Sequence, residues 1–533
     1  MADDNNIHNE QNLESSEISR RDVIKGLVTL PAVGGILYGA YRKTKYDKAL
    51  RGEILAEIGL SPDVQNQAGK VVRVDRSKQI RLGIIGFGIR GEQLVRAAGF
   101  ASEEWMNIMT ERALRSGNNA GLNMFSDQDD LNVVFNGVCE IFDVELEAAH
   151  KTVSINGNDA KRYHKWEDLI AADDIDAVII ATPDHWHAPM AIAAAKAGKH
   201  VYLEKPMTHK MQETYDLFET VKKTGIKLQL GHQFRQTESH NKAKDLIKKG
   251  ILGPVTMVQT NTNRNSPNGA WQYPIHEKAS QKTIDWERFL GNAPKVPFNK
   301  DHFFRWRKYW AYGTGLSGDL LTHDFDAMNQ VLDLGIPKSV SASGGIYFFK
   351  DGREVPDVFN VIFEYPERDL TFQYSATLAN EFNRPSIIMG HDATMEVGNT
   401  LVVYPDRRST RYKDKIQDGT IDLSLPLFAY RPGSQGVDAI TSATERYFAE
   451  KGYLYTYRNG RRVDATHLHI AEWLDSIRMD GVPSCNIDQG FIEAIAAHMG
   501  TLSLHLGRRV EWDHENNFFA NVSEEEVLTV LKG

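Results

Sequence analysis

A glycine-rich turn between an apolar strand and a helix constrains the fold of this chain more than any other feature. The segment IRLGIIGFGIRGEQLVRAAG begins with the apolar run Ile80–Ile85, turns at Gly86, Gly88 and Gly91, and continues in a helical pattern. Gly86 permits a sharp turn, Gly88 permits close approach of a pyrophosphate, and Gly91 lets the helix pack against the strand. This order favours a dinucleotide-binding motif over a glycine-rich turn without function. The expected cofactor contacts are Gly86, Phe87, Gly88, Ile89, Arg90 and Gly91.

An acidic residue at the end of the next strand would bind the ribose hydroxyls of a dinucleotide. The apolar run Leu131–Cys139 predicts that strand, and Glu140 follows it. Glu140 lies 49 positions after Gly91, where about 20 is usual, so we interpret residues 100–130 as an insertion. Asp143 is the competing candidate, and a surface acid without a role is the alternative for Glu140. No arginine adjoins Glu140, so NAD is favoured over NADP.

Apolar strands alternate with helices over the following hundred residues. We assign strands to Ala177–Ala181, His200–Leu203 and Ile226–Leu230. This alternation is typical of an α/β fold with a doubly wound parallel sheet, whose ligands bind at the carboxyl ends of the strands. The segments 86–91, 182–187 and 204–206 all fall on that edge. The second and third segments add the candidate cofactor contacts Thr182, Pro183, Asp184, His187 and Glu204.

Four motifs together resemble the Gfo/Idh/MocA family of NAD(P)-dependent oxidoreductases: GFGIRG, ATPDHWH, LEKP and GDLLTHDFD. The resemblance runs from about Ile80 to Asp513. It implies a Rossmann domain, residues 76–233, followed by a C-terminal α/β domain, residues 234–533. In the family, the second domain carries a large open antiparallel sheet that covers the active site and often mediates dimers or tetramers. We therefore expect a homo-oligomer.

The family resemblance also implies roles for individual residues. Lys205 is expected beside the nicotinamide, followed by a cis proline bond, where a desolvated lysine polarises a substrate oxygen and takes part in proton transfer. On a helix, Asp319 and His323 share one face with Asp326. We predict His323 as the general acid/base and Asp319 as the group that orients it, with Asp319 also a candidate substrate ligand. A solvated helix face and a divalent metal at these three residues are the alternatives.

Two further residues are predicted to contact the substrate. Arg235 follows the last predicted Rossmann strand and matches a family position that often faces substrate. Trp310 belongs to the aromatic segment FFRWRKYWAYGTG, which precedes the predicted catalytic helix, and its ring is suited to stacking on a sugar. Packing in the core is the alternative for the aromatic side chains of this segment. Glu204 is expected to bind the cofactor or to orient the lysine loop.

The remainder of the second domain predicts a sheet and two terminal helices. Strands are assigned to Ser339–Phe349, Val358–Tyr365, Leu370–Leu378 and Ser386–Val397, and helices to His467–Met479 and Gln489–Leu506. We expect the terminal helices to pack on the Rossmann domain. The irregular, aromatic stretch 404–462 has no assigned role beyond that of a lid or a subunit contact.

The first 75 residues differ in character from the rest. Arg20 and Arg21 precede an uncharged run, Gly26–Tyr41, which is shorter than the roughly 20 apolar residues of a membrane span. The pattern resembles a twin-arginine export signal, which predicts a periplasmic or cell-envelope location. Retention as a membrane anchor and a buried helix in a cytoplasmic protein are the alternatives. Residues 1–75 are thus expected to comprise a disordered start, this signal and a linker.

The sequence as a whole predicts an exported NAD-dependent oxidoreductase that acts on a secondary alcohol of a sugar, glycoside or polyol. A formal net charge of −9 argues against a nucleic-acid partner, and two cysteines cannot build a disulfide framework or a thiolate metal site. One alternative is an NAD-dependent glycoside hydrolase that oxidises its sugar transiently. Certain relatives with that activity carry valine at the position of Lys205, which favours the dehydrogenase. The second alternative is a non-catalytic NAD-binding protein.

Overall fold

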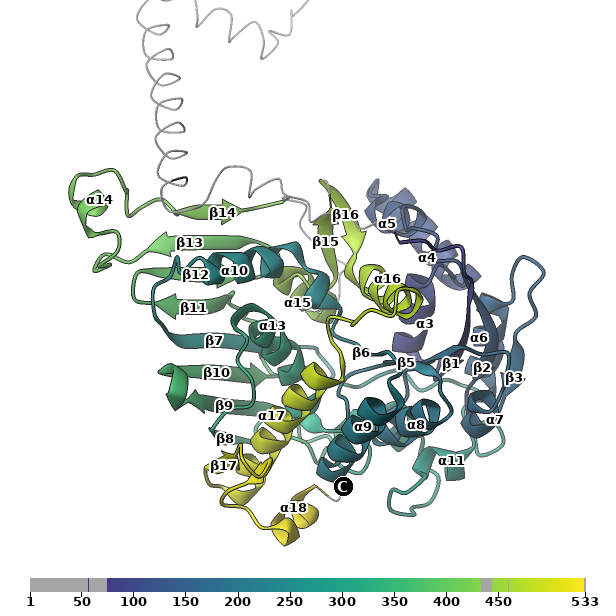
Figure 1. Cartoon of the computed structure of the whole chain (residues 1–533). Helices are drawn as coiled ribbons and strands as arrows, with labels where there is room; N and C mark the ends of the chain where they lie inside the picture. Colours follow the sequence, from purple (N-terminus) through teal and green to yellow (C-terminus); the bar gives the residue numbers. More distant parts are fainter. Residues whose placement is uncertain (1–55, 57–73, 433–442, 459, 532–533) are drawn as a thin grey trace, which may run out of the picture. The chain divides into compact units, whose positions relative to one another are not determined.

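The glycine-rich turn lies at the edge of a parallel sheet, which is the first of two large sheets in the computed structural model (Figure 1). The structure describes residues 74–432, 443–458 and 460–531, together with residue 56. The described elements from residue 74 onwards belong to one compact unit. The predicted export signal, residues 20–41, lies outside the described residues. None of the described helices is long and apolar enough to cross a membrane.

The parallel sheet has six strands in the order β3-β2-β1-β4-β5-β6, and all neighbouring pairs run in the same direction. The strands are β1 (Ile80–Ile85), β2 (Val133–Cys139), β3 (Lys161–Tyr163), β4 (Ala177–Ile180), β5 (His200–Leu203) and β6 (Leu228–Leu230). The side chains of β4 and β6 are buried throughout, because apolar strands of this kind are covered on both faces. The predicted doubly wound α/β fold is confirmed.

Helices cover both faces of the parallel sheet. One hydrophobic cluster joins the strands to α7 (Trp166–Ile170), α8 (Asp184–Lys196) and α9 (Met211–Thr224). A second cluster on the other face contains α3 (Ile89–Ala97), α6 (Asp143–Val153) and α16 (Ala465–Arg478). Helix α16 comes from the far end of the chain, and its Trp473 packs against Tyr202 of β5. The terminal helix α16 therefore packs on the Rossmann half, as expected.

The second sheet has ten strands in the order β14-β13-β12-β11-β7-β10-β9-β8-β17-β18. Its strands are β7 (Val255–Asn263), β8 (Ser339–Gly345), β9 (Val358–Tyr365), β10 (Leu370–Thr377), β11 (Ser386–Gly390), β12 (Ala393–Val397), β13 (Leu401–Pro405), β14 (Phe428–Tyr430), β17 (Val510–Asp513) and β18 (Phe518–Phe519). Strands β7 and β10 are parallel, whereas the other neighbouring pairs are antiparallel. The large sheet is therefore mixed, and β7, in its middle, was not predicted.

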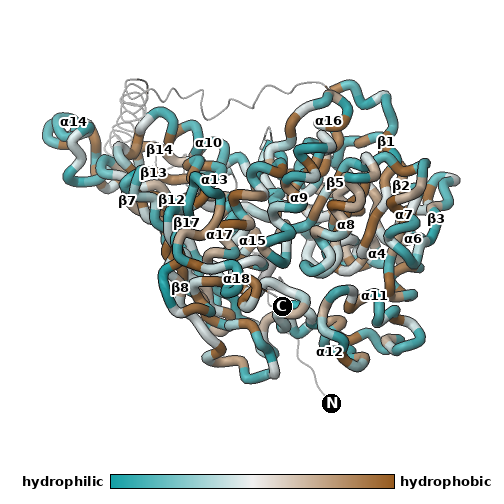
Figure 2. The backbone as a smooth tube through the Cα atoms, turned by 60° about the horizontal axis from the view of Figure 1, so that its bottom comes forward, coloured by the Kyte–Doolittle hydropathy of each residue, from teal (hydrophilic) through white to brown (hydrophobic). Residues whose placement is uncertain are grey.

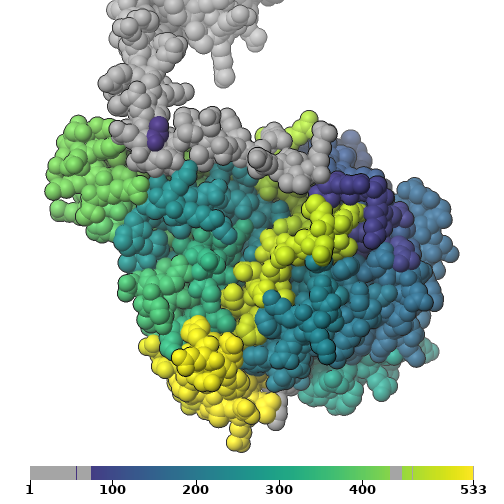
Figure 3. Space-filling model, in the orientation of Figure 1, coloured from purple at the N-terminus to yellow at the C-terminus, as the bar shows by residue number. Residues whose placement is uncertain are grey.

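The helices of the second half pack against one face of this large sheet (Figure 1). They include α10 (Glu238–Lys248), the π-helical turn η4 (Ser317–Leu321), α13 (Thr322–Leu332) and α17 (Ile487–Leu506). Helix α17 contacts α9 of the Rossmann half as well as β8 of the large sheet. In Figure 3 the last part of the chain, in yellow, runs at the surface between the blue Rossmann elements and the green elements of the large sheet.

The remaining elements lie in connections or at the end of the described chain. They are α4 (Glu103–Ser116), α5 (Ala120–Ser126), η2 (Gln233–Gln236), α11 (Trp286–Leu290), α12 (Lys300–Phe304), η3 (Trp306–Lys308), η5 (Pro366–Arg368), α14 (Lys413–Gln417), α15 (Ala443–Lys451), β15 (Tyr455–Arg458), β16 (Arg461–Asp464) and α18 (Glu524–Val530). The expected insertion, residues 100–130, thus contains the two helices α4 and α5. Hydrophobic segments, brown in Figure 2, run through the parallel sheet, whereas the excursion around α14 is mostly teal.

Candidate active site

A cavity of about 520 Å³ lies at the carboxyl edge of the parallel sheet and is also lined by residues of the second half. Of the predicted site residues, it is lined by Gly86, Gly88, Ile89, Arg90, Glu140, Thr182, Pro183, Asp184, Glu204, Lys205, Asp319 and His323. Phe87, Gly91, His187, Arg235 and Trp310 are not in its lining. Three βα connections therefore meet at one cavity with the start of the helix pair η4–α13.

The glycine turn is shaped to bring its backbone close to a ligand. Gly86 has a φ of +89°, and a Cβ atom there would lie 2.7 Å from the carbonyl oxygen of Ala181. A Cβ at Gly91 would lie 2.2 Å from the carbonyl oxygen of Gly86, so Gly91 permits the tight packing of α3 on the turn. Nothing lies within 4 Å of the Cβ position at Gly88. The open space above Gly88 and the start of α3 fit a dinucleotide pyrophosphate.

Glu140 lies at the end of β2, beside this turn. Its carboxylate accepts hydrogen bonds from the backbone N–H groups of Phe87, at 2.8 Å, and Ile141, at 2.7 Å. Burial raises the pKa of Glu140, while these hydrogen bonds act in the opposite direction. The side chain of Phe87 is buried, and its backbone N–H is the group that donates to Glu140. The competing candidate, Asp143, begins α6 as an exposed residue outside the cavity lining.

A second carboxylate, Glu145, lines the cavity near Glu140. Burial raises the pKa of Glu145 to about 7, and the charge of Glu140 adds to this shift. Helix α6 carries Glu145 on its first turn, one turn beyond the end of β2. The end of the cavity beside the glycine turn thus contains two acidic side chains that burial shifts toward the neutral form.

Lys205 and Asp319 form the central ion pair of the cavity. Lys205 Nζ donates to Asp319 Oδ1 at 2.8 Å and to the Asp319 carbonyl oxygen at 2.6 Å. The peptide bond between Lys205 and Pro206 is cis, as the family resemblance implies. The same carboxylate accepts from Arg307 Nε at 3.2 Å and from Trp271 Nε1 at 3.1 Å. Burial alone would raise the pKa of Asp319, but the Lys205 and Arg307 cations outweigh it and hold that pKa well below its usual range.

His323 lies beside this ion pair in an aromatic enclosure. The centroids of the His232, Phe234 and Phe448 rings lie 5.3, 5.6 and 5.6 Å from the centroid of its imidazole. Burial lowers the pKa of His323 well below its usual value, and the Lys205 cation lowers it further. Within the described residues, His323 Nδ1 has no hydrogen-bond partner. The imidazole is therefore neutral near pH 7 and is suited to accept a proton.

The geometry corrects the predicted relation between Asp319 and His323. No hydrogen bond joins the two side chains in the described part of the chain, because the Asp319 carboxylate turns to Lys205, Arg307 and Trp271. Asp319 lies in the π-helical turn η4, whereas His323 lies in α13. The prediction assumed one regular α-helix, and the wider turn shifts the angular relation between the residues.

Arg235 also departs from its predicted role. It is 7% exposed, and its guanidinium donates to Asp326 Oδ2 at 2.8 Å and to the Ser484 carbonyl oxygen at 2.5 Å. Arg235 thus joins η2 to α13 inside the protein instead of facing the substrate. Asp326, the third residue of the conceivable metal site, is occupied by this ion pair. The described residues contain no cluster of three or more metal-ligating side chains.

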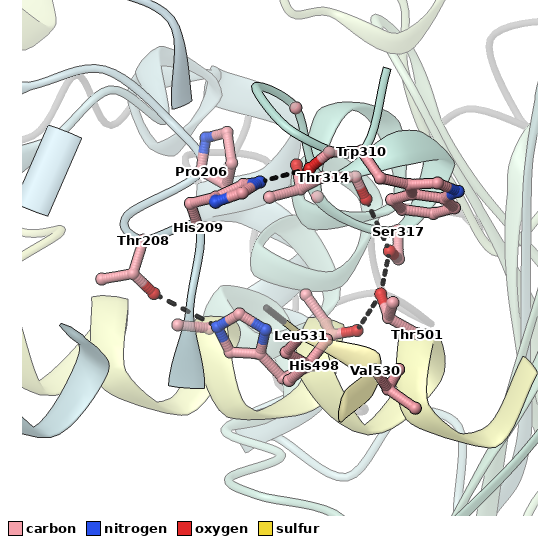
Figure 4. A pocket seen from close by; sticks show the side chains of 14 residues that line it. Pro206, Thr208, His209, Trp310, Thr314, Ser317, His498, Thr501, Val530 and Leu531 are labelled. Carbon is pink, nitrogen blue, oxygen red and sulfur yellow. Dashed lines mark hydrogen bonds between the residues drawn. The ribbon is translucent and has the colours of Figure 1, made fainter. Parts of the chain in front are cut away.

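Trp310 lines a different cavity, which is shown in Figure 4. That cavity has a volume of about 30 Å³, far less than the 520 Å³ of the large cavity. His209 Nε2 lies 2.8 Å from the Trp310 carbonyl oxygen, and Trp310 Nε1 donates to the Glu354 carbonyl oxygen at 3.1 Å. The predicted stacking of Trp310 on a sugar is therefore corrected. Trp306, from the same aromatic segment, lines the large cavity.

His187 supports the loop 204–206, which contains Lys205, from outside the cavity. Its ring nitrogens lie 2.6 Å from the carbonyl oxygen of Pro206 and 2.8 Å from that of Thr182. The side chain is buried, so it connects two of the loops at the sheet edge and lies outside the cavity lining. Arg90 makes a similar connection at the surface of the cavity, because its Nε donates to Glu204 at 2.7 Å. Glu204 therefore orients the loop through Arg90.

Several residues of the cavity were not singled out from the sequence. They include Arg264, Trp271, Tyr273, His276 and Arg307. They lie in irregular connections between residues 264 and 310, where neither strand nor helix periodicity indicates which side chains turn inward. The only signal in that region is the density of aromatic and basic residues in the segment that contains Arg307.

Comparisons with known proteins agree with this architecture. Residues 80–232 match the model of the oxidoreductase family with an NAD-binding Rossmann fold, and residues 240–396 match the GFO/IDH/MocA C-terminal domain. Levoglucosan dehydrogenase of Pseudarthrobacter phenanthrenivorans is 32% identical over 190 residues, which is 34% of this chain and 41% of that protein. An uncharacterized oxidoreductase of Synechocystis is 32% identical over 341 residues, which is 62% of this chain and 77% of that protein.

A solved structure extends the likeness at the level of the fold. The structure of levoglucosan dehydrogenase in complex with NADH and levoglucosan covers 81% of this chain, and 99% of that chain is matched. The TM-score is 0.54 and the sequence identity is 18%. At that identity the likeness shows a shared fold and does not identify the substrate of this chain.

Proposed function

Since the chain belongs to the GFO/IDH/MocA family of oxidoreductases, whose Rossmann domain binds NAD, we propose that it is an NAD-dependent dehydrogenase of sugars, glycosides or polyols. One observation carries this proposal. Lys205, Asp319 and His323 line the same cavity as the glycine turn and Glu140. A substrate carbinol between Lys205 and His323 would then meet a cofactor whose pyrophosphate lies over Gly88.

The residues at the ion pair supply the proton chemistry of an alcohol oxidation. Bound NAD supplies the hydride acceptor, so the hydroxyl proton must pass to the protein. His323 is neutral and takes that proton as the general base. Lys205 turns from Asp319 to donate a hydrogen bond to the substrate oxygen, which stabilises the negative charge that develops there. Asp319 holds the Lys205 ammonium in place before the substrate binds. When Lys205 turns to the substrate, Arg307 still neutralises the Asp319 carboxylate.

Reduction of bound NAD by sugars tests this proposal. Purified protein is mixed with NAD and a panel of sugars and polyols, and the absorbance of reduced nicotinamide is followed. Replacing Lys205 by Met is expected to lower turnover at least 100-fold, while NAD binding, measured by calorimetry, changes little. Lys196→Met is the matched control, because Lys196 is an exposed residue of α8. Turnover that persists in Lys205→Met contradicts the role of the lysine.

The same assay distinguishes the two alternative functions. A glycoside hydrolase with transient oxidation would release phenol from an aryl glycoside without net accumulation of reduced nicotinamide. A non-catalytic NAD-binding protein would bind NAD and turn over neither kind of substrate. Lys205 in the cavity supports the dehydrogenase, because its ammonium can stabilise the alkoxide that develops when an alcohol is oxidised. That reaction requires no leaving group.

We also propose that the protein is exported to the periplasm or cell envelope. The motif around Arg20 and Arg21 and the uncharged run Gly26–Tyr41 support this proposal. Fractionation of cells that express the full chain is expected to place it outside the cytoplasm, either free or held at the membrane. Arg20→Lys/Arg21→Lys should retain it in the cytoplasm, and an unchanged distribution would refute a twin-arginine route.

A further inference from the structure

The substrate end of the cavity carries more positive charge than its carboxylates neutralise. Lys205 and Arg307 share the single carboxylate of Asp319, at 2.8 and 3.2 Å. A third cation, Arg264, lines the same cavity. Arginines elsewhere in the lining have their own acids, since Arg90 pairs with Glu204 at 2.7 Å and Arg288 with Glu167 at 3.0 Å. Asp184 also lines the cavity and accepts from Thr314. Lys205, Arg264 and Arg307 therefore face two carboxylates, which leaves one positive charge in surplus.

Arg264 has no acceptor for two of its guanidinium nitrogens in the part of the chain that the structure describes. Its Nε and Nη2 atoms are buried and unbonded. The side chain starts immediately after β7, where the backbone N–H of Arg264 donates to the Thr377 carbonyl oxygen at 2.9 Å. Its guanidinium carbon lies 5.1 Å from the centroid of the Tyr447 ring and 5.4 Å from that of Phe448. Two aromatic rings therefore hold the cation in place without supplying an acceptor.

Phe448 connects this cation to the predicted base. Its ring centroid lies 5.6 Å from that of His323, so one side chain contacts both His323 and Arg264. Arg264 thus lies at the reacting end of the cavity, away from the glycine turn that receives the pyrophosphate. Leaving buried N–H groups without acceptors is unfavourable, and more so for charged groups. A ligand that accepts from Arg264 removes that cost when it binds.

We propose that the substrate is a sugar acid whose carboxylate is bound by Arg264. The planar guanidinium fork matches a carboxylate with two parallel hydrogen bonds. The positive charges of Lys205 and Arg307 do not repel such an anion. Lys205 and His323 then act on a hydroxyl of the same molecule. This inference rests on the proposed dehydrogenase function and specifies its substrate class. A singly charged planar group matches one unpaired guanidinium better than a phosphate does.

Three probes that differ in one substituent test the charge requirement. Glucose, glucuronate and glucose 6-phosphate are compared as reductants of bound NAD. The expected order places glucuronate first, with a kcat/KM at least 10-fold above that of glucose. Preference for glucose, or equal rates for both, overturns the inference. A preference for glucose 6-phosphate shows that the site takes phosphate and overturns the assignment to a carboxylate.

Substitution of Arg264 tests whether this residue supplies the selectivity. Arg264→Met is expected to lower the ratio of kcat/KM for glucuronate to kcat/KM for glucose about 10- to 100-fold, mainly through KM for glucuronate. Arg264→Lys should recover part of the loss, because it keeps the charge but loses the bidentate geometry. Arg384→Met, at an exposed position, is the control. An equal loss for both sugars in Arg264→Met, with thermal unfolding unchanged, overturns the role of Arg264.

These outcomes separate this inference from the proposed function. If no sugar or polyol reduces NAD, the dehydrogenase proposal itself fails. If glucose reduces NAD well and glucuronate does not, the dehydrogenase proposal stands and the sugar-acid inference alone fails. Calorimetric titration of the protein–NAD complex with glucuronate gives a second measure that does not depend on turnover, and absence of binding at millimolar concentration counts against the inference.

Discussion

At the scale of single residues, charge and burial decide what each side chain of the cavity can do. His323 is surrounded by aromatic rings and a neighbouring cation, which makes its neutral form the stable one. Asp319 has the opposite environment, because two cations stabilise its charged form. A neutral base and a fixed carboxylate are therefore available at the same pH. The family resemblance implied a place at the site for both residues, and the structure shows that their side chains have different partners.

Glu145 provides a prediction at this scale, since its pKa is raised to about 7 by burial, with a contribution from Glu140. An exposed glutamate has a pKa near 4.3, so between about pH 4.3 and 7 the folded protein holds a proton that the unfolded chain has released. The contribution of this group to stability is therefore present below that window and is lost as the pH rises through it. Glu145→Gln stays neutral and should avoid the loss.

Thermal unfolding at pH 5 and pH 8 measures this effect. Relative to wild type, Glu145→Gln is expected to gain about 1–3 °C more in Tm at pH 8 than at pH 5. Glu219→Gln, at an exposed position of α9, serves as the control and should show no such difference. A Tm difference that is the same at both pH values would mean that Glu145 titrates as an exposed acid.

At the scale of elements, the apolar strands of the parallel sheet and the alternating strands β9 and β10 were predicted, whereas β7 was not. The runs at β1, β4 and β5 are apolar because helices cover both faces of their sheet, so the pattern in the sequence is unambiguous. Strand β7, with the sequence VTMVQTNTN, alternates polar and apolar residues unevenly and pairs parallel with β10 across more than a hundred positions. Pairing over that separation leaves no local signal.

Turns that deviate from regular helix were also beyond prediction. A helical pattern over Asp319 and His323 assumes a constant rotation per residue, and the π-helical turn Ser317–Leu321 changes it. The single strand predicted for Ser386–Val397 divides into β11 and β12, because the chain bends at His391 and Asp392. A Cβ at Gly390, the last residue of β11, would collide with the Leu252 carbonyl oxygen. Both deviations depend on tertiary contacts instead of local propensity.

The ion pair between η2 and α13 gives a prediction at the element scale. Arg235→Met leaves Asp326 as an unpaired buried charge, which is expected to cost about 3–5 kcal/mol of folding stability. Because Arg235 lies outside the cavity lining, KM for sugar should be unchanged in the folded fraction. Denaturant unfolding and steady-state kinetics measure the two quantities separately.

A double variant sharpens this test. Arg235→Met/Asp326→Leu removes both charges, so it should recover most of the stability lost in the single variant. If instead Arg235→Met raises KM while the free energy of unfolding is unchanged, Arg235 contacts the substrate as first expected, and the buried ion pair is not its main role.

At the scale of the whole molecule, the outer face of the large sheet is available for association. Ile362 in β9 is 42% exposed and Met257 in β7 is 37% exposed, each on the side away from the helices. Exposed apolar residues on a sheet face are consistent with the homo-oligomer that the family resemblance implies. The oligomeric state therefore stays a prediction that rests on this face.

Light scattering coupled to size-exclusion chromatography tests the association. Wild type is expected to elute as a dimer or larger, and Ile362→Lys should shift it toward the monomer by placing an ammonium in the contact. Lys415→Glu, on the distant α14 segment, is the control and should leave the mass unchanged. A wild-type mass equal to one chain contradicts the prediction directly.

Helix α17 has a mechanical consequence for how the molecule exchanges its ligands. It packs on α9 of one half and on β8 of the other, and it also contacts η4, which carries Asp319. A helix that packs against both halves resists a hinge motion between them, because such a motion would separate packed surfaces on one side. We therefore expect ligands to enter and leave through the opening of the cavity while the two halves stay fixed relative to each other. Rotamer changes of side chains at that opening would then control the exchange.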